Sequence, residues 1–295
     1  GWGALGATTE RVFVDIGAGN IEAGDHVEKG TSMQKLVEQM FIKTFFPTKI
    51  DPSATTTFTL NNTVEAGTEG LTITVDFNDG EILGKNNALG VWVPTDVQNN
   101  SYAGAPTSYI INGTTINSTS YSQSYEFIDE TIEDGVNTFI STVNYSQGPM
   151  PIDSKDNDYP TIRNNGGSVQ TSRSITGVRR IWYGAFDYIF TISETNIRNL
   201  GAYIDSTGEG VGGSFTINIL AGTEYVLIAA PTDVGPPTVI QSGAGIQVGV
   251  SDVFNSTTLQ VRGANEFIGD RSNYTAYFFQ PNEPFEENTT YVVTI

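Results

Sequence analysis

Residues 71–77 read Leu-Thr-Ile-Thr-Val-Asp-Phe, a strict alternation of apolar and polar side chains. Successive side chains of a strand point to opposite faces, so this pattern is typical of a β-strand with one buried face. The same period of two recurs in short runs from residue 49 to the C-terminus, with turn-forming residues between the runs. Short strands separated by turns are typical of antiparallel sandwiches and barrels, and we therefore predict an all-β fold.

We expect residues 49–165 to form an immunoglobulin-like β-sandwich. Asn112-Gly113 lies between two apolar runs and is the dipeptide that a type I′ hairpin turn prefers. A stretch of about 110–120 residues in this style has the size of one such domain. The cysteine pair of antibody domains is missing, so the prediction covers the architecture alone.

We expect a second β-sandwich in residues 166–295. Residues 146–174 are rich in turn formers and poor in apolar residues, which indicates a long loop or an inter-domain connection. Residues 225–230 (Tyr-Val-Leu-Ile-Ala-Ala) form a nearly continuous apolar run, typical of a central strand buried on both faces. Ser193 is the expected N-cap of a short helix.

Residues 1–48 are expected to hold a strand at 10–16 and one amphipathic helix. Thr31 and Gln34 form a T-x-x-Q capping box. Apolar residues then follow at i, i+3, i+4, i+7 and i+8, which places them on one helix face. This face either packs on a sheet of its own domain or docks on a neighbouring subunit. The candidate subunit interface consists of Met33, Leu36, Val37, Met40 and Phe41.

The composition argues against several classes of function. The net charge of −19 repels phosphate backbones and anionic lipids, so nucleic acids and membrane surfaces are poor partners. Cysteine is absent, which excludes thiol catalysis and zinc–thiolate sites. No run approaches 18 apolar residues, so no membrane-spanning helix is expected.

Patterns typical of catalysis are absent from the sequence. The one histidine, His26, lies in a turn-like stretch, and no Gly-x-Ser-x-Gly elbow accompanies it. Asp76–Glu81 and Asp153–Asp158 are rich in oxygen ligands for calcium, but neither has EF-hand spacing, and turns favour the same residues. We predict no enzyme activity, no cofactor and no metal site, with calcium left open at these two segments.

Aromatic side chains gather in residues 182–190 and leave two interpretations open. They form either a glycan-stacking platform or, as alternating spacing favours, parts of the core and of a subunit interface. The residues are Trp182, Tyr183, Phe186, Tyr188 and Phe190.

Several short sequence segments follow one another in an order that can be compared with known families. A strand and a capped helix ending in Phe-Phe-Pro lead into the first domain, which closes with Tyr-Ser-Gln-Gly-Pro-Met-Pro-Ile-Asp-Ser at 145–154. Arg-Ile-Trp-Tyr-Gly at 180–184, Thr-Asn-Ile-Arg at 195–198 and the apolar run at 225–231 follow. In this order the chain resembles structural proteins of tailed-bacteriophage particles, of the head- or tail-associated appendage or decoration type.

The resemblance implies a virion component that assembles as a homo-oligomer, with a trimer as one option, and contacts other virion proteins on the head, neck or tail. A different class of function stays open beside it. Sandwiches also serve as carbohydrate-binding or adhesin modules on a receptor-binding tip or a cell surface, with a host glycan as the ligand.

Overall fold

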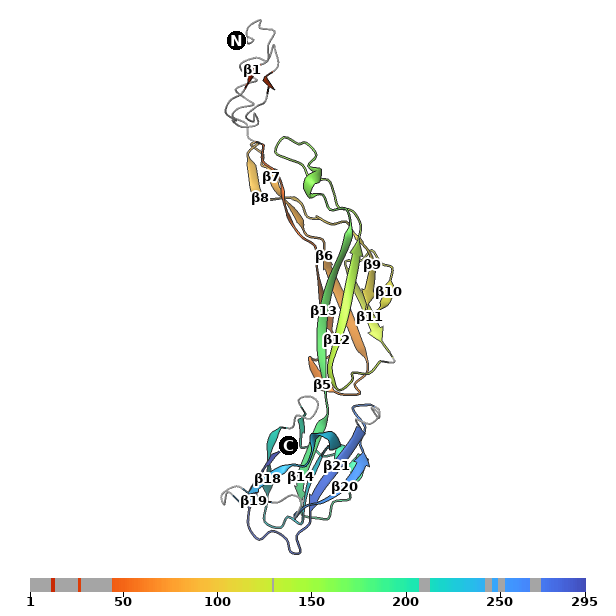
Figure 1. The fold of residues 1–295 in the computed structure, drawn as a ribbon, viewed down its shortest axis with the longest axis vertical. Coiled ribbons are helices and arrows are strands. Elements are labelled where there is room, and N and C mark those ends of the chain that lie inside the picture. Colours follow the sequence, from red (N-terminus) through yellow and green to blue (C-terminus); the bar gives the residue numbers. More distant parts are fainter. Residues whose placement is uncertain are drawn as a thin grey trace.

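The computed structural model describes residues 12–13, 26–27, 44–128, 130–206, 213–241, 246–248, 253–265 and 272–295. These residues are nearly all β, as predicted, and form two sandwiches that follow each other end to end (Figure 1). Among them, no helix has the length and apolar character needed to cross a bilayer.

The first sandwich consists of two sheets that face each other. Its larger sheet has the strand order β10-β9-β12-β13-β5, and the facing sheet has the order β11-β6-β4. All neighbouring strands are antiparallel except β13 and β5, which run parallel. The strands are β4 (Ser53–Phe58), β5 (Thr63–Glu65), β6 (Leu71–Asn78), β9 (Pro106–Ile111), β10 (Thr114–Ile116), β11 (Ser122–Phe127), β12 (Gly135–Tyr145) and β13 (Gly167–Val178).

The alternation in residues 71–77 has the predicted consequence. The four apolar side chains of β6 are buried, whereas its Thr and Asp side chains are half-buried or exposed. The buried side chains belong to one core that also contains Tyr109, Val143 and Ile175 of the facing sheet. The hairpin at Asn112-Gly113 is also confirmed, because both residues have positive φ (46° and 88°), as a type I′ turn requires.

A smaller sheet extends the first sandwich at the end away from the second (Figure 1). It has the order β3-β7-β8 and consists of β3 (Thr48–Ile50), β7 (Glu81–Asn86) and β8 (Trp92–Asn99). The loop that follows β12 packs on this sheet and contains a single turn of 3-10 helix, η1 (Pro160–Ile162). Gln98 of β8 donates to the carbonyl of Ile152 and accepts from its amide, which fixes the loop in place.

The prediction of a loop at residues 146–174 is wrong for residues 167–174. Residues 167–178 form β13, which pairs with β12 along all 11 residues of that strand. The domain boundary therefore lies at Arg179, between β13 and β14, and not at 165/166. Apart from Val169 and Ile175, residues 168–176 are polar, so the hydrophobic alternation that identifies a strand is weak there.

The second sandwich pairs a sheet of order β15-β14-β17-β21-β20 with one of order β16-β22-β18-β19. All seven residues of β17 are buried, as predicted for a central strand. The helix α2 (Glu194–Arg198) has the predicted N-cap, because Ser193 Oγ accepts from the amide of Asn196. The other elements are β14 (Arg180–Phe186), β15 (Tyr203–Asp205), β16 (Ser214–Ile219), β17 (Tyr225–Pro231), η2 (Thr232–Val234), β18 (Thr238–Gln241), β19 (Ile246–Val248), β20 (Asn255–Gln260), β21 (Asn273–Phe279) and β22 (Thr289–Thr294).

Two hydrophobic clusters explain why β17 is buried on both faces. On one face Ile228 and Ala230 pack in a core with Phe215 and Val293 of the second sheet. On the other face Leu227 and Ala229 belong to a separate cluster with Phe190 and Ile197, which the segment after β14 contributes. The same sheet is thus the middle layer of this domain.

Little of the predicted N-terminal segment lies within the described residues. β1 (Val12–Phe13) falls in the strand expected at 10–16 and pairs antiparallel with β2 (His26–Val27). The expected helix lies outside the described residues. So do its candidate interface residues, Met33, Leu36, Val37, Met40 and Phe41, and their role stays a prediction.

Candidate functional site

The first calcium candidate, Asp76–Glu81, forms a tight turn between β6 and β7. Asn78 Oδ1 accepts from the amide of Gly80, which has a φ of 73°. Asp79 Oδ2 accepts from the hydroxyl of Tyr121 at 3.0 Å. These polar groups therefore stabilise the turn and its contact with the strand β11 region.

The second candidate, Asp153–Asp158, is also organised as a turn. Asp153 Oδ1 accepts from the amides of Lys155 (2.8 Å) and Asn157 (3.0 Å). Burial would raise the pKa of Asp153, but these hydrogen bonds outweigh it and lower the pKa. In the part of the chain that the structure describes, no group of three or more His, Cys, Asp or Glu side chains is placed to hold a metal ion.

The aromatic side chains of residues 182–190 divide between the core and the surface. Trp182 and Phe190 are buried, and Phe186 is half-buried, stacking on Phe190 with 4.7 Å between ring centroids. Tyr183 is half-buried against Phe215 in the other core. Tyr188 alone among the five is exposed, with 54% of its surface accessible, and its ring leans on Phe186 at 5.5 Å.

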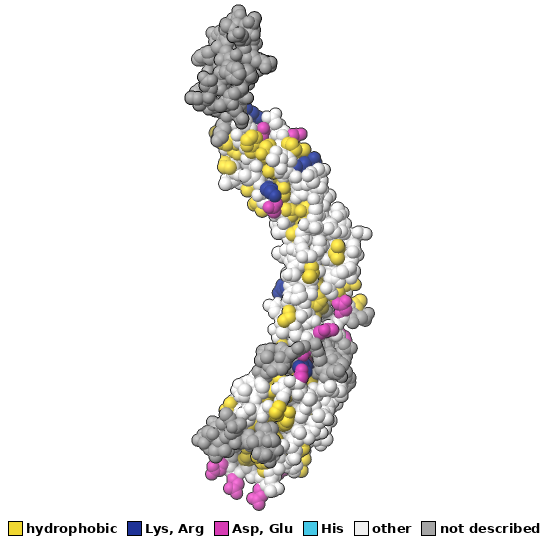
Figure 2. All heavy atoms as spheres, in the orientation of Figure 1, with side chains coloured by type: hydrophobic (Ala, Val, Ile, Leu, Met, Phe, Trp, Pro, Cys, Tyr) yellow, Lys and Arg dark blue, Asp and Glu magenta, His cyan; other side chains and the backbone are white. Residues whose placement is uncertain are grey.

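The most highly organised polar cluster of the described residues lies where the two sandwiches meet. We call it the joint, and it consists of Glu65, Asp134, Arg179, Arg180, Arg198 and Asp233. Three arginines face three carboxylates, so the joint has no net charge. Figure 2 shows acidic and basic side chains together at this level of the molecule, beside a surface that is otherwise mostly uncharged.

Arg179, the residue between β13 and β14, is the centre of one half of the joint. Its Nε lies 2.7 Å from Oδ2 of Asp134 in the first sandwich, and both side chains are almost completely buried. Its Nη2 lies 2.8 Å from Oδ2 of Asp233, the middle residue of η2 in the second sandwich. Burial alone would lower the pKa of Arg179, but the hydrogen bond to Asp233 and the charge of Asp134 outweigh it, so the pKa is raised.

Glu65, at the end of β5, is the centre of the other half. Its carboxylate contacts Arg198 Nη1 at 2.7 Å and Arg180 Nη1 at 3.0 Å, and its side chain is 8% exposed. Arg198 also donates to the carbonyl of Arg262 at 2.7 Å and lies over the ring of Trp182. One carboxylate of the first sandwich thus binds two guanidinium groups of the second, in charge-assisted hydrogen bonds.

The two sandwiches also contact each other through the backbone, in addition to the ion pairs of Arg179 and Glu65. The amide of Ala264 in the second sandwich donates to the carbonyl of Ala66 in the first at 2.8 Å. A Cβ on Gly263 would lie 2.1 Å from that carbonyl oxygen, so only glycine allows this approach. The two sandwiches therefore meet through buried ion pairs and a direct backbone contact.

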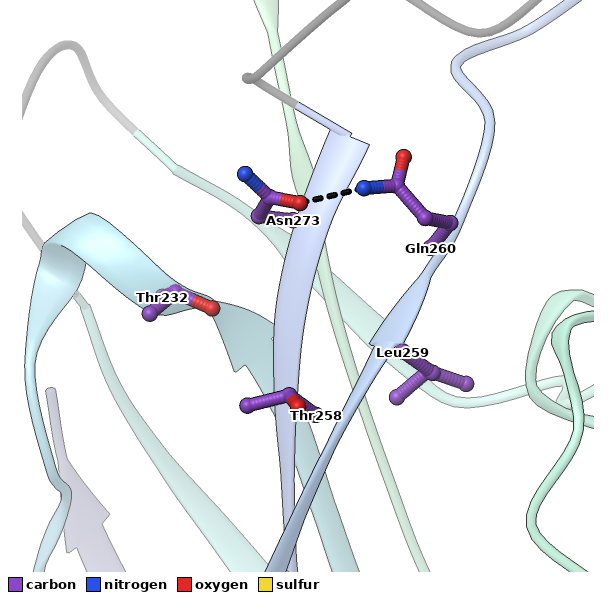
Figure 3. Close-up of a pocket in the computed structure, with 5 residues that line it drawn as sticks. All are labelled: Thr232, Thr258, Leu259, Gln260 and Asn273. Carbon is purple, nitrogen blue, oxygen red and sulfur yellow. Dashed lines mark hydrogen bonds between the residues drawn. The ribbon is translucent and has the colours of Figure 1, made fainter.

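The described residues also line open hollows, and one of these lies beside the joint. It has a volume of about 420 Å³ and is lined by Thr232, Thr258, Leu259, Gln260 and Asn273. Figure 3 shows the amides of Gln260 and Asn273 pointing toward each other across β20 and β21, where Gln260 Nε2 donates to Asn273 Oδ1. Among the described residues, its lining has amides and hydroxyls but no acid or base for proton transfer.

A second hollow, of about 460 Å³, includes the exposed Tyr188. It is lined by Tyr188, Ile189, Phe190, Thr191, Asn196, Asn199 and Leu200. A third, of about 380 Å³, lies at the end of the β9–β10 hairpin, where Glu130 and Glu133 contribute the acidic groups.

Sequence reasoning did not find the joint. Glu65 and Arg198 are 133 residues apart, and no local pattern links a turn glutamate to a helix arginine. The one available signal was Arg179-Arg180 itself, two adjacent arginines at the start of a predicted strand in a chain with only 14 Lys and Arg. No family model, no curated protein and no solved structure matches this chain.

Proposed function

We propose that this chain is a structural component of a tailed-bacteriophage virion, which works by assembly as a homo-oligomer on the head, neck or tail. The observation that carries the proposal is the joint. An appendage protein has to keep its domains in a fixed relative orientation. Ion pairs that are buried between two domains stabilise one orientation, because a change in the angle between the domains would leave buried charges unpaired. The proposal assigns no reaction, no cofactor and no metal to the chain.

The surface supports the same proposal. Most outward-facing strand positions bear Ser, Thr or Asn, as on β16, where Ser214, Thr216 and Asn218 alternate with the buried Phe215 and Ile217. Such side chains bind water without adding charge to the surface. Many copies of the chain can therefore lie close together despite a net charge of −19 each. The partners proposed are other copies of the chain and other virion proteins.

The proposal is tested by finding the chain in native particles. Gold-labelled antibodies against the purified full chain should bind at a regular position on intact virions in electron micrographs. Labelling that is absent from every particle, although the chain is expressed in the infected cell, would overturn it.

The N-terminal segment is tested in the same system. Deletion of residues 1–48 should abolish incorporation into particles and change the oligomeric state if Met33, Leu36 and their neighbours form the subunit interface. Unchanged incorporation and mass would reject this role while leaving the virion assignment in place.

A carbohydrate-binding function is the second candidate, and the hollow at Tyr188 favours it. Sugars bind to exposed aromatic rings that are flanked by planar polar groups, and here Tyr188 lies beside the amides of Asn196 and Asn199. Asn196 Nδ2 donates to the carbonyl of Thr191 at 2.8 Å, which fixes the orientation of that amide.

A glycan array probed with the full chain tests this second function. Saturable binding should be lost in Tyr188→Ala and kept in Tyr121→Ala, which removes a tyrosine of similar exposure (44%) from the first sandwich. An array without signal, or equal loss in both variants, would reject the site.

A further inference from the structure

Four strands of the larger sheet in the first sandwich, β9, β10, β12 and β13, form an outer face without charge. By strand register, the outward-pointing residues of β9, β10, β12 and β13 are uncharged without exception. We call them the neutral face: Ser108, Ile110, Thr115, Val136, Thr138, Ile140, Thr142, Asn144, Ser168, Gln170, Ser172, Ser174 and Thr176. In the view of Figure 2 the middle of the molecule is likewise almost free of blue and magenta side chains.

The other sheet of the same sandwich offers an internal comparison. Its outward-pointing residues include the acidic Asp76 on β6 and Glu126 on β11, both exposed. They include no aliphatic side chain, whereas the neutral face exposes Val136 (72%) and Ile140 (47%). The two faces therefore differ both in charge and in apolar surface.

The polar groups of the neutral face already bind one another. Thr138 Oγ1 and Ser174 Oγ are 2.9 Å apart, and Asn144 Nδ2 donates to Ser108 Oγ at 2.9 Å. A polar group that keeps its hydrogen bond loses little when water is removed from it. Covering this face is thus less costly than covering a surface of free hydroxyls, and burial of Val136 and Ile140 adds a favourable contribution.

We propose that the neutral face binds the neutral face of a second copy of this chain. Each copy has a net charge of −19, so two copies repel each other wherever acidic surfaces approach. Contact through the neutral face brings no like charges together at its centre, and interface cores are in general depleted of charged residues. Glu130 and Glu133 line a hollow together with Thr138, at the joint end of the face.

The size of the face indicates a weak contact. β12 has 11 residues, which corresponds to a length of about 36 Å, and neighbouring strands lie roughly 4.8 Å apart. Because β9 and β10 are shorter, the face covers roughly 500 Å² per copy, so a pair buries about 1,000 Å², at the lower limit of specific interfaces. Such a contact becomes effective where other parts of a particle hold the copies side by side.

This inference rests on the homo-oligomer of the proposed function and names the surface that forms it. In the simplest arrangement the two sheets pack face to face about a two-fold axis, with like strands near the axis. Ile140 and its cross-strand partner Ser172 lie near the middle of the face, so each would meet its own copy across the axis.

The absence of cysteine permits a direct test. In the purified full chain, Ile140→Cys and Ser172→Cys should each form covalent dimers with a short bismaleimide. Ser124→Cys is the matched control, because it places an equally exposed thiol in the same sandwich on the outer face of the opposite sheet, where Ser124 pairs with Thr74. Its dimer yield should be at least about tenfold lower.

A further variant distinguishes a specific contact from cross-linking by random collision of two chains. Adding Ile140→Glu to Ser172→Cys places two like charges at the centre and should reduce the dimer yield to that of the control. Equal yields for all three single-cysteine variants, or no dimer at either neutral-face position, would overturn the inference.

The same variants separate this inference from the proposed function. Dimers formed by a chain that no particle contains would support the face and reject the virion assignment. Particles that contain the chain but show no cross-link at either neutral-face cysteine would support the virion assignment and reject the neutral face as an interface.

Discussion

Arg179 and Asp134 form an ion pair with 2.7 Å between Nε and Oδ2, and their side chains are 3% and 1% exposed. Arg179 is the residue that connects the two sandwiches, and Asp134 precedes the first residue of β12. The same guanidinium also lies 2.8 Å from Oδ2 of Asp233 in the second sandwich. Arg179 therefore keeps both of its carboxylate partners only when the second domain holds Asp233 in place.

Replacement of Asp134 by Asn should destabilise the protein strongly. It leaves the guanidinium of Arg179 buried with one carboxylate fewer, and breaking a buried pair in this way costs about 3–5 kcal/mol. Asp233→Asn is the matched control, since that side chain is 53% exposed and its loss should cost about 1 kcal/mol or less. Denaturant unfolding of both variants measures the difference, and equal midpoints would contradict it.

Gly263→Ala should loosen the joint without disturbing either core. The added Cβ would lie 2.1 Å from the carbonyl oxygen of Ala66, so the hydrogen bond from Ala264 to Ala66 would break. Gly201→Ala is the control, because nothing lies within 4 Å of a Cβ there. Trypsin should then cleave next to Arg179 faster in Gly263→Ala than in the wild type or the control. An unchanged cleavage rate would show that the joint tolerates the methyl group.

The strands with strong alternation or a continuous apolar run were predictable from the sequence. β6 and β17 bury the side chains that their patterns indicate, and the Asn112-Gly113 turn needs only local backbone preferences. β13 was not predictable, because its inner face includes Arg173, whose guanidinium lies over the ring of Phe58 and donates to the carbonyl of Thr56. A charged residue facing inward removes the pattern on which strand prediction depends.

The joint was beyond sequence reasoning for a different reason. Its ion pairs link β5, the segment before β12, α2 and η2, and only the tertiary fold brings these elements together. The two acidic segments, Asp76–Glu81 and Asp153–Asp158, were visible in the sequence, but their role was not. Their composition is compatible with calcium ligands but favours turns, and the hydrogen bonds of Asn78 and Asp153 to nearby amides show how each segment forms its turn.

Asp153→Ala should open the turn at residues 153–158. It removes two hydrogen bonds to backbone amides, which corresponds to a loss of about 1–2 kcal/mol and to faster tryptic cleavage at Lys155. Because the pKa of Asp153 is lowered from 3.8, its contribution is present above that value and lost as pH falls through the lowered pKa. Asp158→Asn, at an exposed carboxylate, is the control and should leave cleavage at Lys155 unchanged.

Stability should also fall at alkaline pH, and Tyr225 should account for part of the loss. Burial raises the pKa of Tyr225 from 10.0 to about 12, and its ring stacks on Phe278 with 5.6 Å between centroids. The unfolded chain therefore releases this proton first, so stability is fully present below pH 10 and decreases as pH rises from about 10 to 12.

Tyr225→Phe keeps the aromatic ring and removes the ionisable group. Denaturant unfolding at several pH values should show a smaller loss between about pH 10 and 12 in this variant than in the wild type, with parallel behaviour below pH 9. Some loss should remain, because burial also raises the pKa of Tyr274, Tyr277 and Tyr291. An identical alkaline profile in the two proteins would mean that Tyr225 ionises at the same pH in the folded and unfolded chain, contrary to its position in the middle layer of the second sandwich.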